Sequence, residues 1–129
     1  MKNYFLILII SLFTYSCAKR DNCNNNLPIV GSYENIYDKQ AKNVLILRKD
    51  STFEQIFTKG RTIKRNKGSY KFFRNSCSIY FKNLKVFQNL SKLKEEYHTE
   101  EEYPAKFRNN NVIFLEDFPD EFDYYRIYE

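Results

Sequence analysis

The chain is poor in several residue types on which common active sites depend. Its 129 residues include three glycines, one histidine and no tryptophan. With so few glycines it has no glycine-rich loop to cradle a phosphate group, and no nucleotide-binding fingerprint is present. The single histidine, His98, stands among glutamates, which indicates a solvated acidic surface, with fortuitous binding of a divalent cation as the alternative. We therefore expect no metal site, no cofactor and no enzymatic activity.

Two weaker routes to catalysis stay open. Cys77 and His98 are the sole candidate pair of a nucleophile and a base, and nothing near either of them in the sequence supports that role. Carboxylates also gather near the C-terminus, at Asp117, Asp120, Glu121 and Asp123. An acidic loop is the common meaning of such a cluster. A hydrolase built on two of these carboxylates would require an open cleft that brings them together.

The chain also lacks an apolar run long enough to cross a membrane. Its N-terminal run, residues 4–13, is about ten residues long, whereas a spanning helix needs ~20. Lys2 precedes this run and Ser16-Cys17 follows it, an order that resembles the signal peptide of a bacterial lipoprotein. The resemblance implies that residues 1–16 are removed and that Cys17 is acylated. The alternatives are an ordinary secretory signal with a coincidental cysteine and an uncleaved anchor.

Acylation of Cys17 would hold the protein on a membrane of the bacterial cell envelope by its fatty chains. In similar lipoproteins an acidic run after the cysteine directs the protein to the cell surface, but here Lys19 and Arg20 stand beside a single Asp21. We therefore expect a periplasm-facing position, and we take the protein to be a monomer. Residues 17–28 are rich in asparagine and predict a flexible tether, which leaves residues 29–129 as one domain.

Charge is unevenly distributed along the chain, although the net charge is only +5. Residues 17–90 carry 15 Lys and Arg against 5 Asp and Glu, whereas residues 91–129 carry 5 against 11. Such asymmetry is typical of a nucleic-acid or membrane-surface patch, and nucleic acid is not an expected partner of an exported protein. The simpler interpretation is that the two halves pair within one fold.

Two cysteines, Cys23 and Cys77, remain once Cys17 is assigned to lipid. An oxidising periplasm permits a disulfide between them, which would close a loop of more than 50 residues. Because Cys23 belongs to the predicted tether, such a bond would be easily lost. Cys77 could instead be a small buried hydrophobic residue.

The remainder of the chain predicts short strands, because aromatic and β-branched residues recur at alternate positions between turn residues. We expect strands at residues 30–37, 43–48, 52–58, 69–73, 78–81, 84–90, 103–108, 112–116 and 123–128. Residues 91–102 could form at most one short helix, and Asn109-Asn110-Asn111 predicts a hairpin turn. This spacing indicates an all-β, antiparallel barrel of eight or nine short strands.

Five short motifs follow one another in a characteristic order. They are Gly31-Ser32-Tyr33, Val44-Leu45-Ile46-Leu47, Asp50-Ser51-Thr52-Phe53, Gly68-Ser69-Tyr70 and Ile79-Tyr80-Phe81. This order resembles small lipocalin-like lipoproteins of Bacteroidota and, more distantly, the N-terminal barrel of the copper-stress lipoprotein NlpE. The resemblance covers about residues 30–82 and implies a lipocalin-like barrel. The Cys-x-x-Cys pair of NlpE-like barrels is missing, so copper handling is not implied.

Two parts of such a barrel could bind a partner. Lipocalin-like barrels often hold small apolar ligands, and the side chains expected to line that site are Tyr33, Phe53, Phe57, Tyr70 and Phe72. A basic connection between two predicted strands carries Lys59, Arg61, Lys64, Arg65 and Lys67. On a hairpin tip these cations could contact lipid headgroups or an acidic partner, or simply protect a sheet edge. The leading expectation is a non-enzymatic binding domain for a small apolar ligand, with an envelope interaction protein as the alternative.

Overall fold

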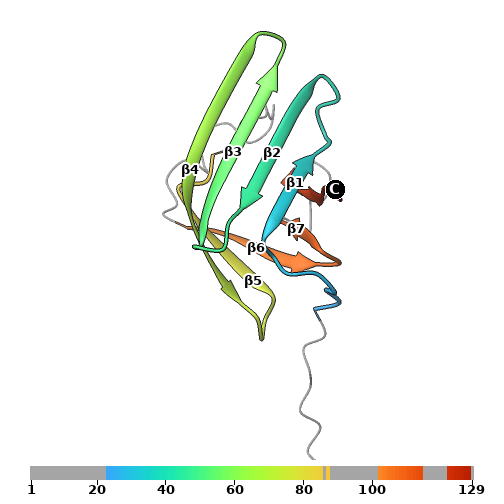
Figure 1. Cartoon of the computed structure of the whole chain (residues 1–129), viewed down its shortest axis with the longest axis vertical. Coiled ribbons are helices and arrows are strands. Elements are labelled where there is room, and N and C mark those ends of the chain that lie inside the picture. The colour runs from blue at the N-terminus through green and yellow to red at the C-terminus, as the bar shows by residue number, and fades with distance from the viewer. Residues whose placement is uncertain (1–22, 86, 88–101, 115–121, 129) are drawn as a thin grey trace, which may run out of the picture.

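The computed structural model describes residues 23–85, 87, 102–114 and 122–128. Within these ranges the chain forms eight strands (Figure 1). Their bounds are β1 Gly31–Asn35, β2 Ala41–Leu47, β3 Thr52–Lys59, β4 Thr62–Phe73, β5 Ser78–Lys82, β6 Glu102–Arg108, β7 Asn111–Ile113 and β8 Tyr125–Arg126. The strands form one sheet in the order β7-β6-β5-β4-β3-β2-β1-β8. Neighbouring strands in this order from β7 to β8 pair antiparallel.

The two edges of this sheet approach each other and nearly close it. Val112 of β7 and Tyr124, which precedes β8, form an antiparallel bridge in which each N–H donates to the other's carbonyl at 2.9 Å. On its other side β8 pairs with β1, where Arg126 lies opposite Tyr33. Closure leaves little unpaired strand edge exposed. The prediction of an all-β, antiparallel barrel of eight or nine strands is confirmed.

Alternation of side chains explains why these segments form strands. Because successive residues of a strand point to opposite faces, Leu45 and Leu47 of β2 share the inner face, and both are buried. Phe53 of β3 lies opposite Leu47 in the register and is fully buried with it. The core thus occupies the inside of the barrel, and the outer face carries most of the charged side chains.

Turn residues set the register of two hairpins. Asn109 and Asn110 join β6 to β7 with φ values of 52° and 63°, the left-handed conformation that asparagine tolerates best after glycine, so the predicted turn is confirmed. Between β2 and β3, Asp50 Oδ1 accepts hydrogen bonds from the Thr52 backbone N–H at 3.1 Å and from its hydroxyl at 2.6 Å. These contacts fix the chain before β3 begins.

The basic segment differs from the prediction of a long connection. The turn between β3 and β4 contains only Gly60 and Arg61, and the segment from Thr62 onward already belongs to β4. The first part of β4 shows no clean alternation, since all but one of its residues up to position 67 are exposed. It is a strand because its backbone pairs with β3 residue by residue, from Lys59↔Thr62 to Thr52↔Ser69.

The predicted strand over residues 84–90 is wrong at its start. Leu84 and Lys85 lie outside the strands, and Asn83 before them turns the chain with a φ of 67°. The Lys85 backbone instead bonds to the Gln55 side chain: its N–H donates to Gln55 Oε1 at 3.0 Å, and its carbonyl accepts from Nε2 at 2.9 Å. The segment considered for a short helix, residues 91–102, lies outside the described residues except for Glu102, which begins β6.

Residues 24–27, predicted as part of a flexible tether, are instead hydrogen-bonded to the β6–β7 hairpin. Asn25 donates from Nδ2 to the Phe107 carbonyl at 2.9 Å and accepts at Oδ1 from the Asn110 N–H at 2.7 Å. Asn110 Oδ1 accepts in turn from the backbone N–H groups of Asn26 and Leu27, both at 3.1 Å. The asparagines that suggested a tether thus hold this segment in place.

The barrel has two distinct ends along β4. In Figure 1 the β3–β4 turn lies at the top, and the β4–β5 turn and the start of the described N-terminal segment lie at the bottom. β4 contains 12 residues, so its ends are about 40 Å apart at ~3.3 Å per residue. At the lower end Cys23 is disulfide-bonded to Cys77. We call this lower end the disulfide end; it comprises residues 23–25, 73–80 and 106–110.

Candidate functional site

The aromatic residues predicted to line an apolar ligand belong to the core. Tyr33 and Phe53 are fully buried, Phe57 and Tyr70 are 5% and 6% exposed, and Phe72 packs against the core from a partly buried position. All five lie on the inner face, as the prediction required. Four of them belong to one packed cluster, which also contains Phe81 and Phe107: Tyr33, Phe53, Tyr70 and Phe72. Phe57 lies outside this cluster, with its ring centroid 5.7 Å from that of Phe87.

Ring contacts show how the barrel interior is filled. Phe81 is the centre: its ring centroid lies 5.5 Å from that of Phe53, 6.2 Å from Tyr70 and 5.3 Å from Phe114. Phe72 meets Phe107 edge to face at 5.8 Å. Contacts at these distances are typical of packed aromatic cores. In the described part of the barrel, the space around Phe81 is therefore occupied by the protein's own side chains.

Hydroxyl groups inside the barrel are bonded to backbone carbonyls or amides. Tyr33 donates to the Ile29 carbonyl, and Tyr70 donates to the Arg48 carbonyl at 2.6 Å. Burial raises the pKa of both phenols, and the charge of Arg126, which lies 5.2 Å from the centre of the Tyr33 ring, opposes the rise for Tyr33. These phenols stay neutral and link the inner wall to neighbouring segments.

A layer of neutral amides crosses the barrel above this aromatic cluster, and sequence reasoning missed it. Asn43, Gln55 and Asn66 point inward from β2, β3 and β4 and are 2%, 1% and 8% exposed. Asn66 Nδ2 donates to Gln55 Oε1 at 2.8 Å and to the Asn83 carbonyl at 2.6 Å. Together with the bonds from Gln55 to Lys85, these contacts fasten the segment that follows β5 across the layer. The sequence held a signal at Gln55, which stands between the inward-facing Phe53 and Phe57. Asn66 follows no such pattern, because the residues two positions away are Lys64 and Gly68.

One atom of this layer lacks a partner. Tyr124 donates its hydroxyl to Asn43 Oδ1 at 3.0 Å, and burial raises the pKa of this phenol to about 12. Asn43 Nδ2 is buried and has no hydrogen-bond partner among the residues that the structure describes. An unpaired buried donor destabilises the folded state, so Asn43 is the weakest member of the layer.

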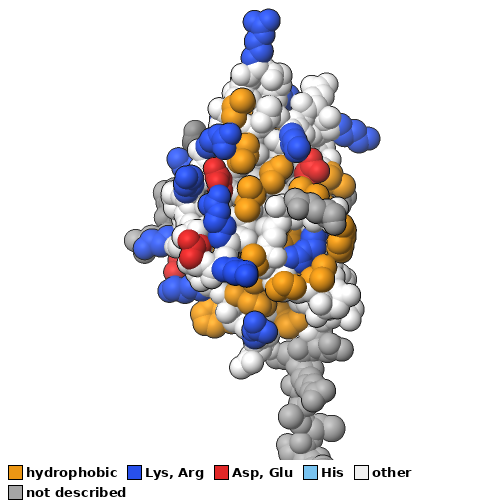
Figure 2. Space-filling model, viewed as in Figure 1, with side chains coloured by type: hydrophobic (Ala, Val, Ile, Leu, Met, Phe, Trp, Pro, Cys, Tyr) orange, Lys and Arg blue, Asp and Glu red, His pale blue; other side chains and the backbone are white. Residues whose placement is uncertain are grey.

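The cations of the β3–β4 hairpin are all exposed, at Lys59, Arg61, Lys64, Arg65 and Lys67. Figure 2 shows Lys and Arg side chains spread over this side of the molecule, with hydrophobic side chains between them and few acidic ones. The structure therefore brings the five predicted residues together on one projecting hairpin. Their number on two paired strands gives this end of the barrel a positive field.

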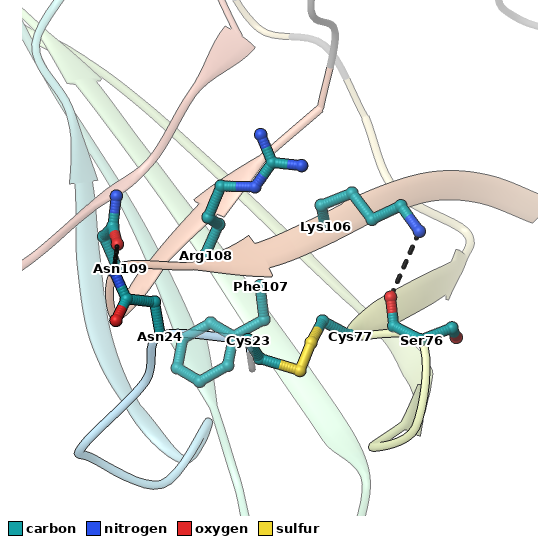
Figure 3. Close-up of a pocket in the computed structure, with 8 residues that line it drawn as sticks. All are labelled: Cys23, Asn24, Ser76, Cys77, Lys106, Phe107, Arg108 and Asn109. Carbon is teal, nitrogen blue, oxygen red and sulfur yellow. Dashed lines mark hydrogen bonds between the residues drawn. A yellow bond between two sulfur atoms is a disulfide. The ribbon is translucent and has the colours of Figure 1, made fainter. Parts of the chain in front are cut away.

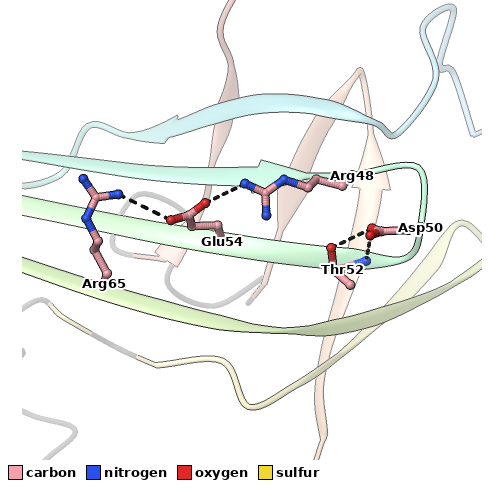
Figure 4. A network of polar contacts seen from close by, with 5 residues as sticks. All are labelled: Arg48, Asp50, Thr52, Glu54 and Arg65. Carbon is pink, nitrogen blue, oxygen red and sulfur yellow. Dashed lines mark hydrogen bonds and ion pairs between the residues drawn. The ribbon is translucent and has the colours of Figure 1, made fainter.

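Two carboxylates neutralise part of this charge. Glu54 of β3 accepts from Arg48 at 2.6 Å and from Arg65 at 3.4 Å (Figure 4). Hydrogen bonding to Arg48 lowers the pKa of Glu54. Lys59 pairs with Asp38 at 2.7 Å, which lowers the pKa of Asp38. Within the described residues, Arg61, Lys64 and Lys67 form no ion pair, so their charges are the ones left for a partner.

A second group of polar and cationic side chains surrounds the disulfide (Figure 3). The Cys23–Cys77 bond, Asn24, Lys106, Arg108 and neighbouring residues line an open hollow of about 620 Å³. Lys106 Nζ donates to the Ser76 carbonyl at 3.1 Å and to Ser78 Oγ at 2.8 Å. Both acceptors are neutral, so the charge of Lys106 is not balanced by a described carboxylate. Sequence reasoning gave these cations no role.

The other predicted site residues fall outside the described part of the chain. This group contains Cys17, His98 and the carboxylates at positions 117, 120 and 121. The exception is Asp123, which is described: it is buried, and its Oδ1 accepts a hydrogen bond from the Phe114 N–H at 3.0 Å. Among the described residues no three His, Cys, Asp or Glu side chains converge to hold a metal ion. In that same part of the chain, no helix has the length and apolar character needed to cross a bilayer.

Comparison with known proteins adds no relative. The chain matches no protein-family model, no curated protein and no solved structure.

Proposed function

We propose that the chain is a lipid-anchored protein of the bacterial envelope, and that its barrel is a non-enzymatic interaction domain whose basic β3–β4 hairpin contacts an acidic partner protein. The anchor in this proposal is Cys17. The position of the hairpin is the observation that supports this proposal most. Its turn lies at one end of β4, and Cys77, to which the N-terminal segment is bonded, lies beyond the other end. A domain anchored near one end presents the other end to its surroundings.

The free charges of the hairpin support an acidic partner. Arg61, Lys64 and Lys67 are exposed and form no ion pair with a described residue. Opposite charges on two proteins accelerate their encounter and favour one docking register. A lipid surface fits the hairpin less well, because its turn lies about 40 Å of strand away from the disulfide end.

An apolar ligand inside the barrel is the other candidate, and the geometry gives it less support. Such a ligand would need the space between Phe53, Phe81 and Tyr70, and these rings already contact one another. Native mass spectrometry of protein extracted from its own membrane separates the two candidates. A bound apolar molecule at one per chain would favour the ligand site, and the same spectrum reports acyl chains on Cys17.

Photo-crosslinking in living cells tests the interaction surface. A photoreactive amino acid at position 64 is expected to give a specific protein adduct whose linked peptide is acidic. The same group at position 82, at the end of β5, is the control. The double variant Lys64→Gln/Lys67→Gln, with the crosslinker placed at position 61, should lose most of that adduct, whereas Lys49→Gln/Lys82→Gln should keep it. Adducts to lipid alone, or equal adducts from both sites, would contradict the proposal.

A further inference from the structure

The disulfide controls how far the domain can lie from an acylated Cys17. Cys23 lies six positions after Cys17, and an extended chain spans at most about 20 Å over that distance. Cys23 is covalently bonded to Cys77 in the β4–β5 turn, and Asn25 and Asn26 bond to the β6–β7 turn. The connection between the barrel and the anchor is therefore short, and it begins at one defined end of the barrel.

That end exposes aromatic side chains. Phe73, the last residue of β4, is 51% exposed, and Tyr80 of β5 is 37% exposed. Their rings meet edge to face with centroids 5.7 Å apart. Both residues occupy outward positions, where they add nothing to the barrel core. Tyrosine is favoured at the level of lipid headgroups, where apolar and polar surroundings meet, and an exposed phenylalanine beside it can insert at the boundary between headgroups and acyl chains.

Cations lie beside these rings. Arg74 follows Phe73 directly and is exposed, and Lys106 and Arg108 line the hollow next to the disulfide. Lys106 is bonded only to neutral oxygens of Ser76 and Ser78 among the described residues. Of the described acidic residues, Glu102 lines the same hollow as Phe73 and Tyr80, and its Oε1 lies 3.9 Å from Lys71 Nζ. The surface is therefore apolar and positive together, which matches an anionic lipid layer.

We propose that the disulfide end is the membrane-contacting surface of the domain, with Phe73 and Tyr80 at headgroup level and Arg74 and Lys106 paired with phosphates of anionic phospholipids. The proposal rests on the lipid anchor of the proposed function for the distance to the bilayer. It adds a fixed orientation: the barrel stands on its disulfide end, and the β3–β4 hairpin points away from the anchoring membrane.

The absence of tryptophan makes a direct test practical. Phe73→Trp and Ile63→Trp each place a single tryptophan on the outward face of β4, ten residues apart and both at exposed positions. The full acylated chain is reconstituted in phosphatidylcholine vesicles with and without phosphatidylglycerol, and nitroxide-headgroup lipid quenches the fluorescence. We expect several-fold stronger quenching of the Phe73→Trp protein. Equal quenching of the two proteins, or stronger quenching at position 63, would overturn the orientation.

Charge variants in the Phe73→Trp background test the role of the cations. Arg74→Gln/Lys106→Gln should remove the increase in quenching that phosphatidylglycerol produces, whereas the matched pair Lys64→Gln/Lys67→Gln should retain it. An unchanged increase in the first double variant would contradict phosphate binding at this end. Urea unfolding midpoints of both double variants verify that each barrel is folded.

The proposed function and this inference fail in different ways. Mass spectrometry without acyl chains on Cys17 would overturn the anchor alone. In that case the Cys17→Ser chain, added to vesicles containing phosphatidylglycerol, still tests the surface: salt-sensitive quenching at position 73 supports it, and no quenching contradicts it. Acylated protein with equal quenching at positions 63 and 73 would overturn the surface and leave the anchor in place.

Discussion

Gly68 of β4 lies directly opposite Phe53 of β3, and the fully buried Phe53 ring covers the position of the missing side chain. A Cβ on Gly68 would stand 2.6 Å from two carbons of this ring and would also overlap the Lys82 carbonyl oxygen. Only a glycine lets the two strands and β5 approach this closely around the ring.

Gly68→Ala is therefore expected to destabilise the protein by about 3 kcal/mol, the upper part of the range for overpacking a core. Gly60→Ala is the matched comparison, because Gly60 has open space around it and only its φ of 57° disfavours alanine, at about 1–2 kcal/mol. Urea unfolding followed by far-UV circular dichroism measures both. Equal losses for the two variants would show that space at Gly68 is not limiting.

Loss of the Cys23–Cys77 bond should destabilise the barrel. The two residues are 54 positions apart, and closing a loop of that length is worth about 4 kcal/mol on the chain-entropy estimate. We expect a reductant to lower the urea midpoint of the wild-type protein accordingly. The Cys23→Ser/Cys77→Ser variant should have the lower urea midpoint without reductant, and adding reductant should not change it. A midpoint that does not respond in the wild-type protein would mean that the bond is absent in solution.

Because the members of the amide layer are bonded differently, we expect two similar substitutions to lower the free energy of unfolding by unequal amounts. Gln55→Leu leaves the Lys85 N–H and carbonyl without their partners, which should cost about 2–3 kcal/mol. Asn43→Leu removes a donor that has no partner among the described residues and takes one of two amide partners, Asn43 and Gln55, from the Tyr124 hydroxyl, so about 1 kcal/mol is expected. Adding Tyr124→Phe to Asn43→Leu should recover part of that loss. Denaturant unfolding of the three variants provides the comparison, and an equal cost for Gln55 and Asn43 would contradict the assigned bonds.

The strands of the barrel could be predicted from the sequence where apolar residues recur at alternate, inward-facing positions and where residue types typical of turns separate these runs. Leu45, Leu47 and Phe53 marked buried faces, and the two asparagines before Asn111 marked the β6–β7 turn. The first half of β4 could not be predicted in this way, since its side chains are exposed and only backbone pairing with β3 makes it a strand. Tertiary pairing of this kind overrides local propensity.

The candidate surfaces were predictable only in part. The cations of the β3–β4 hairpin stand close together in the sequence, so their grouping was visible. The disulfide end combines residues from three distant segments, with Asn25, Cys77 and Lys106 as examples. The asparagine-rich stretch that contains Asn25 predicted a tether. Its hydrogen-bond partners in the β6–β7 hairpin lie more than eighty positions later in the chain, so the local sequence does not reveal them. No local pattern encodes such a pairing.

Glu54 should make stability depend on pH in the acid range. Its side chain is only 12% exposed and accepts hydrogen bonds from Arg48 and Arg65, which hold its folded-state pKa below the usual value. A carboxyl of this kind stabilises the fold fully above its unfolded pKa of about 4.3 and loses that contribution as the pH falls through the lower folded pKa.

Glu54→Gln is therefore expected to be less stable than the wild type by about 1 kcal/mol or less near neutral pH, as for other partly exposed ion pairs. The difference should shrink below about pH 4.3 and vanish once the folded carboxyl is protonated. Urea midpoints of both proteins between neutral and strongly acid pH measure it. Glu34→Gln, at an outward position of β1 and in no ion pair with a described residue, is the charge-matched control: both variants lose one carboxylate, so only the difference between them is assigned to the Glu54 ion pairs. A wild-type advantage at Glu54 that persists in strong acid would show that packing, and not charge, accounts for it.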